Sequence, residues 1–106
     1  MVENSKPKAT IVVIGTFRNG YQEVFTDYSK RVRKFLDSKG ATVIRRQLVE
    51  QTLHGNLSPS LVMVIDFPTR EVAATAFLEL EYLDIIPLRD RVFSDFHMFL
   101  AQYGEV

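Results

Sequence analysis

Cysteine and tryptophan are missing from this sequence, and its positive and negative charges cancel to a formal net charge of +0. Without cysteine the chain has no disulfide, no thiolate metal ligand and no cysteine nucleophile, which fits a reducing compartment. Without net charge it has no overall field that attracts nucleic acid or an acidic membrane surface. We therefore expect a cytoplasmic protein that binds neither nucleic acid nor membranes.

Long hydrophobic runs are missing too. The apolar run nearest the amino terminus covers residues 11–14 and stops at Gly15, so it is too short for a signal-peptide core or a membrane span. The length of 106 residues suits one domain with a modest core. Residues 1–9 are polar and contain Pro7, so we expect a flexible tail over 1–9 and a single domain over 10–106.

Two apolar segments predict the centre of a sheet. Residues 10–17 are apolar and β-branched on both faces of a strand, and residues 61–67 are apolar on both faces until Asp66. Two further strands are expected at 41–53, where charges on both faces are typical of an edge strand, and at 95–103. A turn containing Gly55 and Pro59 is expected over 54–60.

Helical periodicity fills the segments between these strands. The first helix is predicted to end at Gly40, and its apolar stripe recurs at three- and four-residue steps. The stripe consists of Tyr21, Val24, Phe25, Tyr28, Val32, Phe35 and Leu36. Thr69 is the expected N-cap of a second helix, and a helical segment over 82–93 is expected to start again at Pro87. The order βαββαβ predicts an α+β fold of ferredoxin-like type.

An uncovered sheet face follows from this order. The central strands are apolar on both faces, but the helices of the chain suffice to cover only one of them. Monomers rarely expose a contiguous apolar face larger than a few hundred Å². We therefore expect a homodimer that pairs through its sheet faces. The alternative is a monomer whose helices and tail wrap both faces.

Residues in a characteristic order extend over 11–104. They are Phe25, Tyr28, Gly40, Arg46, Gly55, Asp66, Phe67, Pro68, Thr69, Ala73, Ala76, Glu81, Tyr82, Leu88 and Arg89. In this order they resemble unknown-function family 1330, a group of short, mostly bacterial proteins in the dimeric α+β barrel superfamily. Gln47, Leu48 and Glu79 depart from the family pattern, which has small residues and a serine there. The resemblance implies a βαββαβ homodimer with a barrel between two sheets, and it implies no particular activity.

Five polar residues are the candidates for a binding site: Tyr28, Arg46, Asp66, Tyr82 and Arg89. An arginine fork binds a carboxylate at two points, and a tyrosine hydroxyl donates or accepts a hydrogen bond. These residues could hold a small carboxylate or phenolic ligand where strand ends meet helices. Alternatively, Asp66 forms a structural ion pair with Arg46 or Arg89, and the tyrosines anchor the helices.

Other chemistry has little support in the sequence. His54 and His97 have no carboxylate at metal-ligand spacing, so we expect neither a metal nor a cofactor. A histidine-ligated haem, as in some relatives within the superfamily, would need His97 on the barrel wall. Basic residues gather over 30–46, but the aromatic residues near them belong to the buried stripe. We interpret this run as a solvated helix face, because single-stranded nucleic acid is bound with exposed aromatic residues.

Three functions remain open at this point. The first is a small cytoplasmic homodimer that binds an organic acid or aromatic ligand near the intersubunit barrel. The second is a cofactor-free oxygenase or isomerase in which Tyr28, Arg46, Asp66 and Arg89 move protons and hold an anion. The third is a structural interaction module without a ligand.

Overall fold

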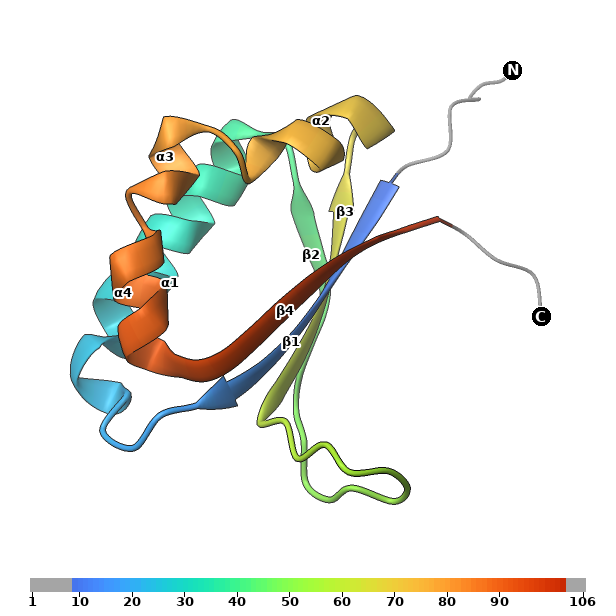
Figure 1. Ribbon diagram of the computed structural model, residues 1–106. Coiled ribbons are helices and arrows are strands. Elements are labelled where there is room, and N and C mark those ends of the chain that lie inside the picture. The colour runs from blue at the N-terminus through green and yellow to red at the C-terminus, as the bar shows by residue number, and fades with distance from the viewer. Residues whose placement is uncertain (1–8, 103–106) are drawn as a thin grey trace.

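The computed structural model describes residues 9–102 (Figure 1). The elements in chain order are β1 (Ala9–Phe17), α1 (Gln22–Ser38), β2 (Thr42–Leu48), β3 (Leu61–Phe67), α2 (Arg70–Ala76), α3 (Leu80–Leu83), α4 (Ile86–Val92) and β4 (Phe93–Ala101). The tail expected over 1–9 lies outside the described residues except for Ala9, which begins β1. The end of the last predicted strand, Tyr103, also lies outside them.

The four strands form one antiparallel sheet in the order β2-β3-β1-β4. The two strands that are apolar on both faces, β1 and β3, are therefore central, and the charged β2 is an edge strand. Figure 1 shows all the helices on one side of this sheet and none on the other. The predicted βαββαβ order and ferredoxin-like α+β fold are confirmed.

Several boundaries differ from the prediction. Strand β2 ends at Leu48 because it pairs there with Leu61, the first residue of β3, so the chain beyond has no strand opposite. Strand β4 begins at Phe93, which pairs with Phe17. The helical segment over 82–93 is two short helices, α3 and α4, and Pro87 lies in the first turn of α4 as expected.

Local signals fix the ends of the other helices. Gly40 follows α1 with a φ of 69°, the left-handed conformation that glycine adopts without strain. The Thr69 hydroxyl accepts a hydrogen bond of 3.1 Å from the Val72 N–H, which caps α2. Both residues are where the sequence predicted these signals.

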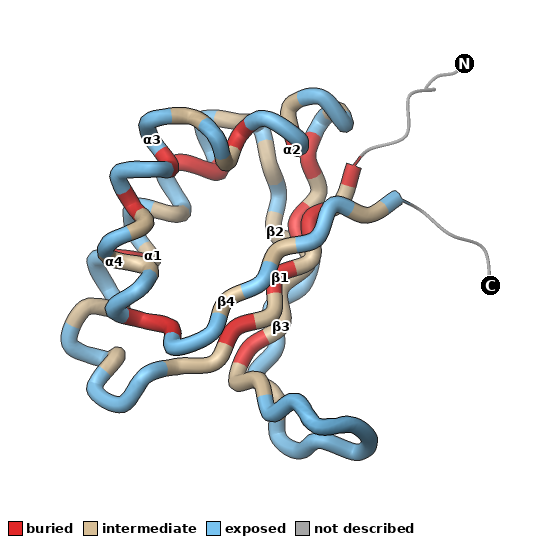
Figure 2. The backbone as a smooth tube through the Cα atoms, viewed as in Figure 1, coloured by how far each residue is buried: buried red, intermediate tan, exposed pale blue. Residues whose placement is uncertain are grey.

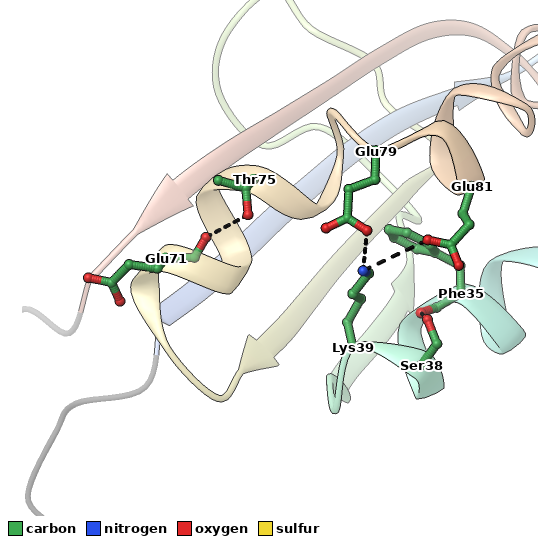
Figure 3. Close-up of polar contacts among 7 residues, drawn as sticks. All are labelled: Phe35, Ser38, Lys39, Glu71, Thr75, Glu79 and Glu81. Atoms are coloured by element: carbon green, nitrogen blue, oxygen red, sulfur yellow. Dashed lines mark hydrogen bonds and ion pairs between the residues drawn. The ribbon is translucent and has the colours of Figure 1, made fainter.

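The end of α1 is also joined to the helices that follow β3 (Figure 3). The Lys39 ammonium pairs with Glu79 and lies 3.9 Å from Glu81. Its stem is largely enclosed, because only 18% of the side chain is exposed. Glu79, one of the departures from the family pattern, therefore has a structural partner that holds the helical layer together.

The hydrophobic core lies between the helices and the sheet. Buried and half-buried residues alternate along β1, as Figure 2 shows, because successive side chains point to opposite faces. Phe67 of β3 and Val92 of α4 are the largest fully buried side chains. The core therefore uses one face of the sheet only.

The opposite, open face of the sheet is apolar at its centre. Val12 pairs with Val64 on one side and with Phe99 on the other, so three apolar side chains form a row across β3, β1 and β4. Phe99 is 52% exposed, and both valines are half-buried. No helix of the described chain covers this row. Within residues 9–102, none of the helices has the length and apolar composition needed to cross a membrane.

Candidate functional site

A cavity of about 70 Å³ lies between α1 and the helix-covered face of the sheet. It is lined by Val13, Phe25, Tyr28, Ser29, Val32, Arg33, Leu36, Val43, Arg46, Leu61, Met63, Phe93 and Phe96. The volume is several times that of one water molecule, at about 10–15 Å³ by this measure. The pocket expected near the barrel between two sheets needs a second chain, so it stays a prediction. The cavity within this chain lies on the helix side of its sheet.

Tyr28 is the buried polar residue of this cavity. It belongs to the apolar stripe of α1, and only 8% of it is exposed. Its hydroxyl has no hydrogen-bond partner among the described residues, although a buried hydroxyl normally has one. Burial, and to a smaller extent Tyr82, raises the pKa of Tyr28 above its ordinary range, while Arg89 and Arg46 oppose the rise. The residue is therefore a neutral phenol with an unused donor.

Arg46 supplies positive charge to the same cavity. It lies on the helix-covered face of β2, opposite Met63 of β3. Its guanidinium is 5.4 Å from the centre of the Phe25 ring, a cation–π contact. Arg46 and Arg33 are the charged residues of the cavity lining, which contains no carboxylate. Within residues 9–102 neither arginine forms an ion pair.

Tyr82 and Arg89 form a second polar pair next to this cavity. The Arg89 guanidinium donates a hydrogen bond of 3.1 Å to the Tyr82 hydroxyl and one of 3.2 Å to the Asp90 carboxylate. It also stacks 4.9 Å from the centre of the Phe96 ring, which lines the cavity. Burial raises the pKa of Tyr82, although the hydrogen bond from Arg89 lowers it. This pair therefore supports the cavity wall without lining it.

Asp66 is not part of this arrangement. It lies opposite Thr42 in the register of β2 and β3, so it points to the open face, whereas Arg46 points to the covered face. Its carboxylate accepts a hydrogen bond of 3.0 Å from the Thr10 hydroxyl. In the described part of the chain it has no ion pair, so the predicted pairing with Arg46 or Arg89 is wrong.

The structure thus brings four of the five predicted residues together. The sequence reasoning missed Arg33 and the aromatic wall made by Phe93 and Phe96. Arg33 lies two four-residue steps after Phe25, a member of the predicted stripe, and such steps put residues on one side of a helix. That spacing was the available signal for Arg33. Phe93 was assigned to the helical segment over 82–93, whereas Phe96 lies inside the strand predicted over 95–103.

The histidines are not at the cavity. His97 lies on the open face, where its ring nitrogen is 3.0 Å from the Asp95 carboxylate. The side chains of His97 and Asp95 are 50% and 58% exposed. Among residues 9–102 there is no cluster of three or more histidine, aspartate or glutamate side chains suited to a metal ion.

A four-stranded antiparallel sheet with helices on one face defines a ferredoxin-like α+β fold. The chain belongs to the family described as "Domain of unknown function (DUF1330)", which matches residues 10–102. This confirms the resemblance recognised in the sequence. No curated protein sequence matches the chain.

Solved structures with the same fold have very different sequences. A protein of unknown function from Rhodopseudomonas palustris is 12% identical, with a TM-score of 0.80 over 96% of this chain and 86% of that one. A protein from Arabidopsis thaliana, At3g17210, is 11% identical, with a TM-score of 0.68 over 92% and 97%. SnoaB from Streptomyces nogalater, a cofactor-independent oxygenase, is 14% identical, with a TM-score of 0.60 over 94% and 96%.

Proposed function

We propose that this protein binds a small aromatic or other organic acid in the cavity beneath α1. The observation that supports this proposal most directly is the Tyr28 hydroxyl, which is buried without a partner in the described chain and lines a cavity whose charged residues are both arginines. An unpaired buried hydroxyl costs about 1–3 kcal/mol of stability. A ligand oxygen that accepts from Tyr28 removes this cost.

The lining also defines the chemistry of the ligand. Phe25, Phe93 and Phe96 offer aromatic walls, and Arg46 offers a guanidinium that matches a carboxylate. The volume of about 70 Å³ is below the roughly 300–1,000 Å³ of pockets for drug-sized molecules. The part of the ligand that enters is therefore no larger than one ring or a short chain, with the charged end at Arg46.

Calorimetric titration with benzoate and with neutral benzamide tests this proposal. Arg46→Gln is expected to weaken benzoate binding about tenfold or more, since it removes a charge-assisted contact, and to affect benzamide less. Tyr28→Phe is expected to weaken both ligands about two- to tenfold while the fold is retained. Arg31→Gln is the matched control, because this exposed arginine of α1 does not line the cavity. Equal affinity for benzoate in the unmodified protein and in all three variants would contradict the proposal.

We also propose that two copies pair through the open face of the sheet. The apolar row of Val12, Val64 and Phe99 supports this, because a partly exposed Phe99 and two half-buried valines gain cover from a second sheet. Sedimentation at micromolar concentration is expected to give twice the chain mass of 12.2 kDa. A stable, folded species of 12.2 kDa would refute the pairing. A cytoplasmic location stays a prediction from the cysteine-free composition.

A second candidate function is a cofactor-free oxygenase. The fold similarity to SnoaB, a cofactor-independent oxygenase, with a TM-score of 0.60 favours it. In this chain the hydroquinone would lose a phenolic proton to water, and Arg46 would hold the resulting phenolate. The phenolate would be oxidised by O2, and Tyr28 would donate a proton to the reduced oxygen. Oxygen uptake with a hydroquinone, abolished in Tyr28→Phe, is the expected result. If the protein binds benzoate but takes up no oxygen with any of a panel of hydroquinones, ligand binding without catalysis is favoured. If it neither binds benzoate nor takes up oxygen, a structural interaction module is favoured.

A further inference from the structure

A second concave surface lies directly beside the cavity. It has a volume of about 430 Å³ and runs between the end of α1 and the outer edge of β2. We call it the basic groove, defined by Arg33, Leu36, Asp37, Ala41, Thr42, Val43, Ile44, Arg45 and Arg46. Arg33, Leu36, Val43 and Arg46 line both the groove and the cavity. The two hollows therefore lie next to each other and share four lining residues.

The charges of the basic groove differ from those of the molecule as a whole. Three arginines against one aspartate give +3 −1 = +2 among its lining residues, whereas the whole chain has a formal net charge of +0. Within residues 9–102 none of these arginines and not Asp37 takes part in an ion pair. Positive charge that is concentrated in a concavity and not neutralised by the protein attracts an anion.

The backbone contributes to the same surface. Strand β2 has only one neighbour in the sheet, β3, so its outer edge carries unpaired N–H groups. The register of β2 shifts between Val43 and Arg45, a bulge at Ile44. Because of this bulge Arg46 lies on the same face as Val43 and is one of the shared lining residues. The irregular edge therefore connects the groove to the cavity.

We propose that the natural ligand carries a phosphate group, which lies in the basic groove, on an apolar part that enters the cavity. This inference rests on the proposed function and specifies its ligand class. A phosphate monoester carries a charge of about −1.5 to −2 at neutral pH, which matches the groove, and its oxygens fit the guanidinium fork. A carboxylate would leave about half of this charge unmatched. Nucleic acid fits less well, because no aromatic residue lines the groove for base stacking.

Calorimetry with 4-phenylbutyl phosphate, 4-phenylbutanol and inorganic phosphate tests the inference. The phosphate ester is expected to bind at least tenfold more tightly than the alcohol at low salt, with the advantage falling as salt rises. Arg33→Gln is expected to remove most of this advantage and to change the affinity for the alcohol much less. Arg31→Gln, on the same helix but outside the groove, is expected to keep it.

A variant that is expected to strengthen binding separates loss of the groove's charge from misfolding. Asp37→Asn removes the one carboxylate of the groove lining and is expected to strengthen binding of 4-phenylbutyl phosphate about two- to fivefold. Misfolding cannot produce such a gain. Equal affinities for ester and alcohol would overturn the inference while the proposed function stands. If the unmodified protein bound neither 4-phenylbutanol nor benzoate, the proposed function itself would be overturned. Inorganic phosphate that binds as tightly as the ester would also overturn the inference, because cavity and groove would then not share a ligand.

Discussion

The two faces of the sheet are built from the same strands but have opposite surroundings. Val13 on the covered face is 2% exposed, while its neighbour Val12 on the open face is only half-buried. Both are valines of the central strand β1, so neither residue type nor strand position causes the difference. The helices do, because they lie on one side only (Figure 1). A strand that is apolar on both faces thus predicts that both faces of the sheet are covered, and the helices of this chain cover one of them.

The polar groups follow the same division. Tyr28, Tyr82 and Arg89 lie on the covered side, where burial raises the pKa of both tyrosines. On the open side, Asp95 and His97 form an exposed pair. Water screens such a pair, so it contributes little to stability. Groups with altered acidity are common at functional sites. The covered side is therefore where chemistry is expected, and the open side is where assembly is expected.

The adjacent valines of β1 allow the sharpest test of this comparison. Val13→Asp puts a carboxylate into the core and the cavity wall, and it is expected to cost more than about 4 kcal/mol and to unfold the protein. Val12→Asp is expected to leave a folded chain but to abolish dimerisation, because it charges the centre of the proposed interface. Circular dichroism and sedimentation equilibrium measure the two effects. A dimer that persists in Val12→Asp would show that another surface forms the interface.

Gly15 tests how tightly the covered face is packed. A Cβ atom at this position would lie 2.6 Å from the Phe93 ring, which is far too close. The ring cannot easily move, since it is 4% exposed and packs against Phe17 and Tyr28. Gly15→Ala is therefore expected to lower the free energy of unfolding by about 1–3 kcal/mol.

Urea denaturation measures the effect of Gly15→Ala, and Arg31→Gln at an exposed position of α1 is the control. The control is expected to change the free energy of unfolding by less than about 0.5 kcal/mol, as is usual away from a packed core. Because Phe93 also lines the cavity, Gly15→Ala is expected to weaken benzoate binding as well. Equal unfolding free energies for Gly15→Ala and the unmodified protein would mean that Phe93 does not lie over β1.

The alkaline stability of the protein tests the burial of its tyrosines. The ordinary tyrosine pKa is 10.0, and burial raises the pKa of Tyr28 and Tyr82 above it. Above pH 10 the unfolded chain therefore loses phenolic protons that the folded chain keeps. Stability is fully present below that pH and falls as pH rises, by at most about 1.4 kcal/mol per pH unit for each tyrosine.

Denaturation at several pH values between neutral and strongly alkaline measures this slope. Tyr28→Phe is expected to reduce it, and the double variant Tyr28→Phe with Tyr82→Phe is expected to reduce it further. A slope that Tyr28→Phe leaves unchanged would indicate that the Tyr28 hydroxyl is accessible to water in the folded protein.

Local patterns predicted most of the fold. The bounds of β3, the cap at Thr69, the glycine at residue 40 and the restart at Pro87 all depend on nearby residues, and all are confirmed. The end of β2 was not predictable in this way. It depends on where β3 begins, thirteen positions further along the chain, at Leu61.

The candidate site was predicted only in part for a similar reason. Strict alternation along β2 would place Arg46 and Thr42 on one face, but the bulge at Ile44 reverses the alternation and separates them. Asp66 pairs with Thr42 and is thereby separated from Arg46. No residue near Ile44 signals a bulge, which arises from the pairing with β3. The cavity likewise depends on contacts of Phe93 with residues far away in the sequence.

One further consequence concerns the order in which the chain can fold. Strand β1 pairs from Thr10 to Phe17 with β4, so that Thr10 lies opposite Ala101. During synthesis, β1 and β3 can associate early, but one edge of β1 stays vacant until β4 (Phe93–Ala101) has left the ribosome. Pairing between such distant segments slows folding. Completion of this sheet therefore waits for β4, and a nascent chain is most prone to aggregation just before β4 emerges.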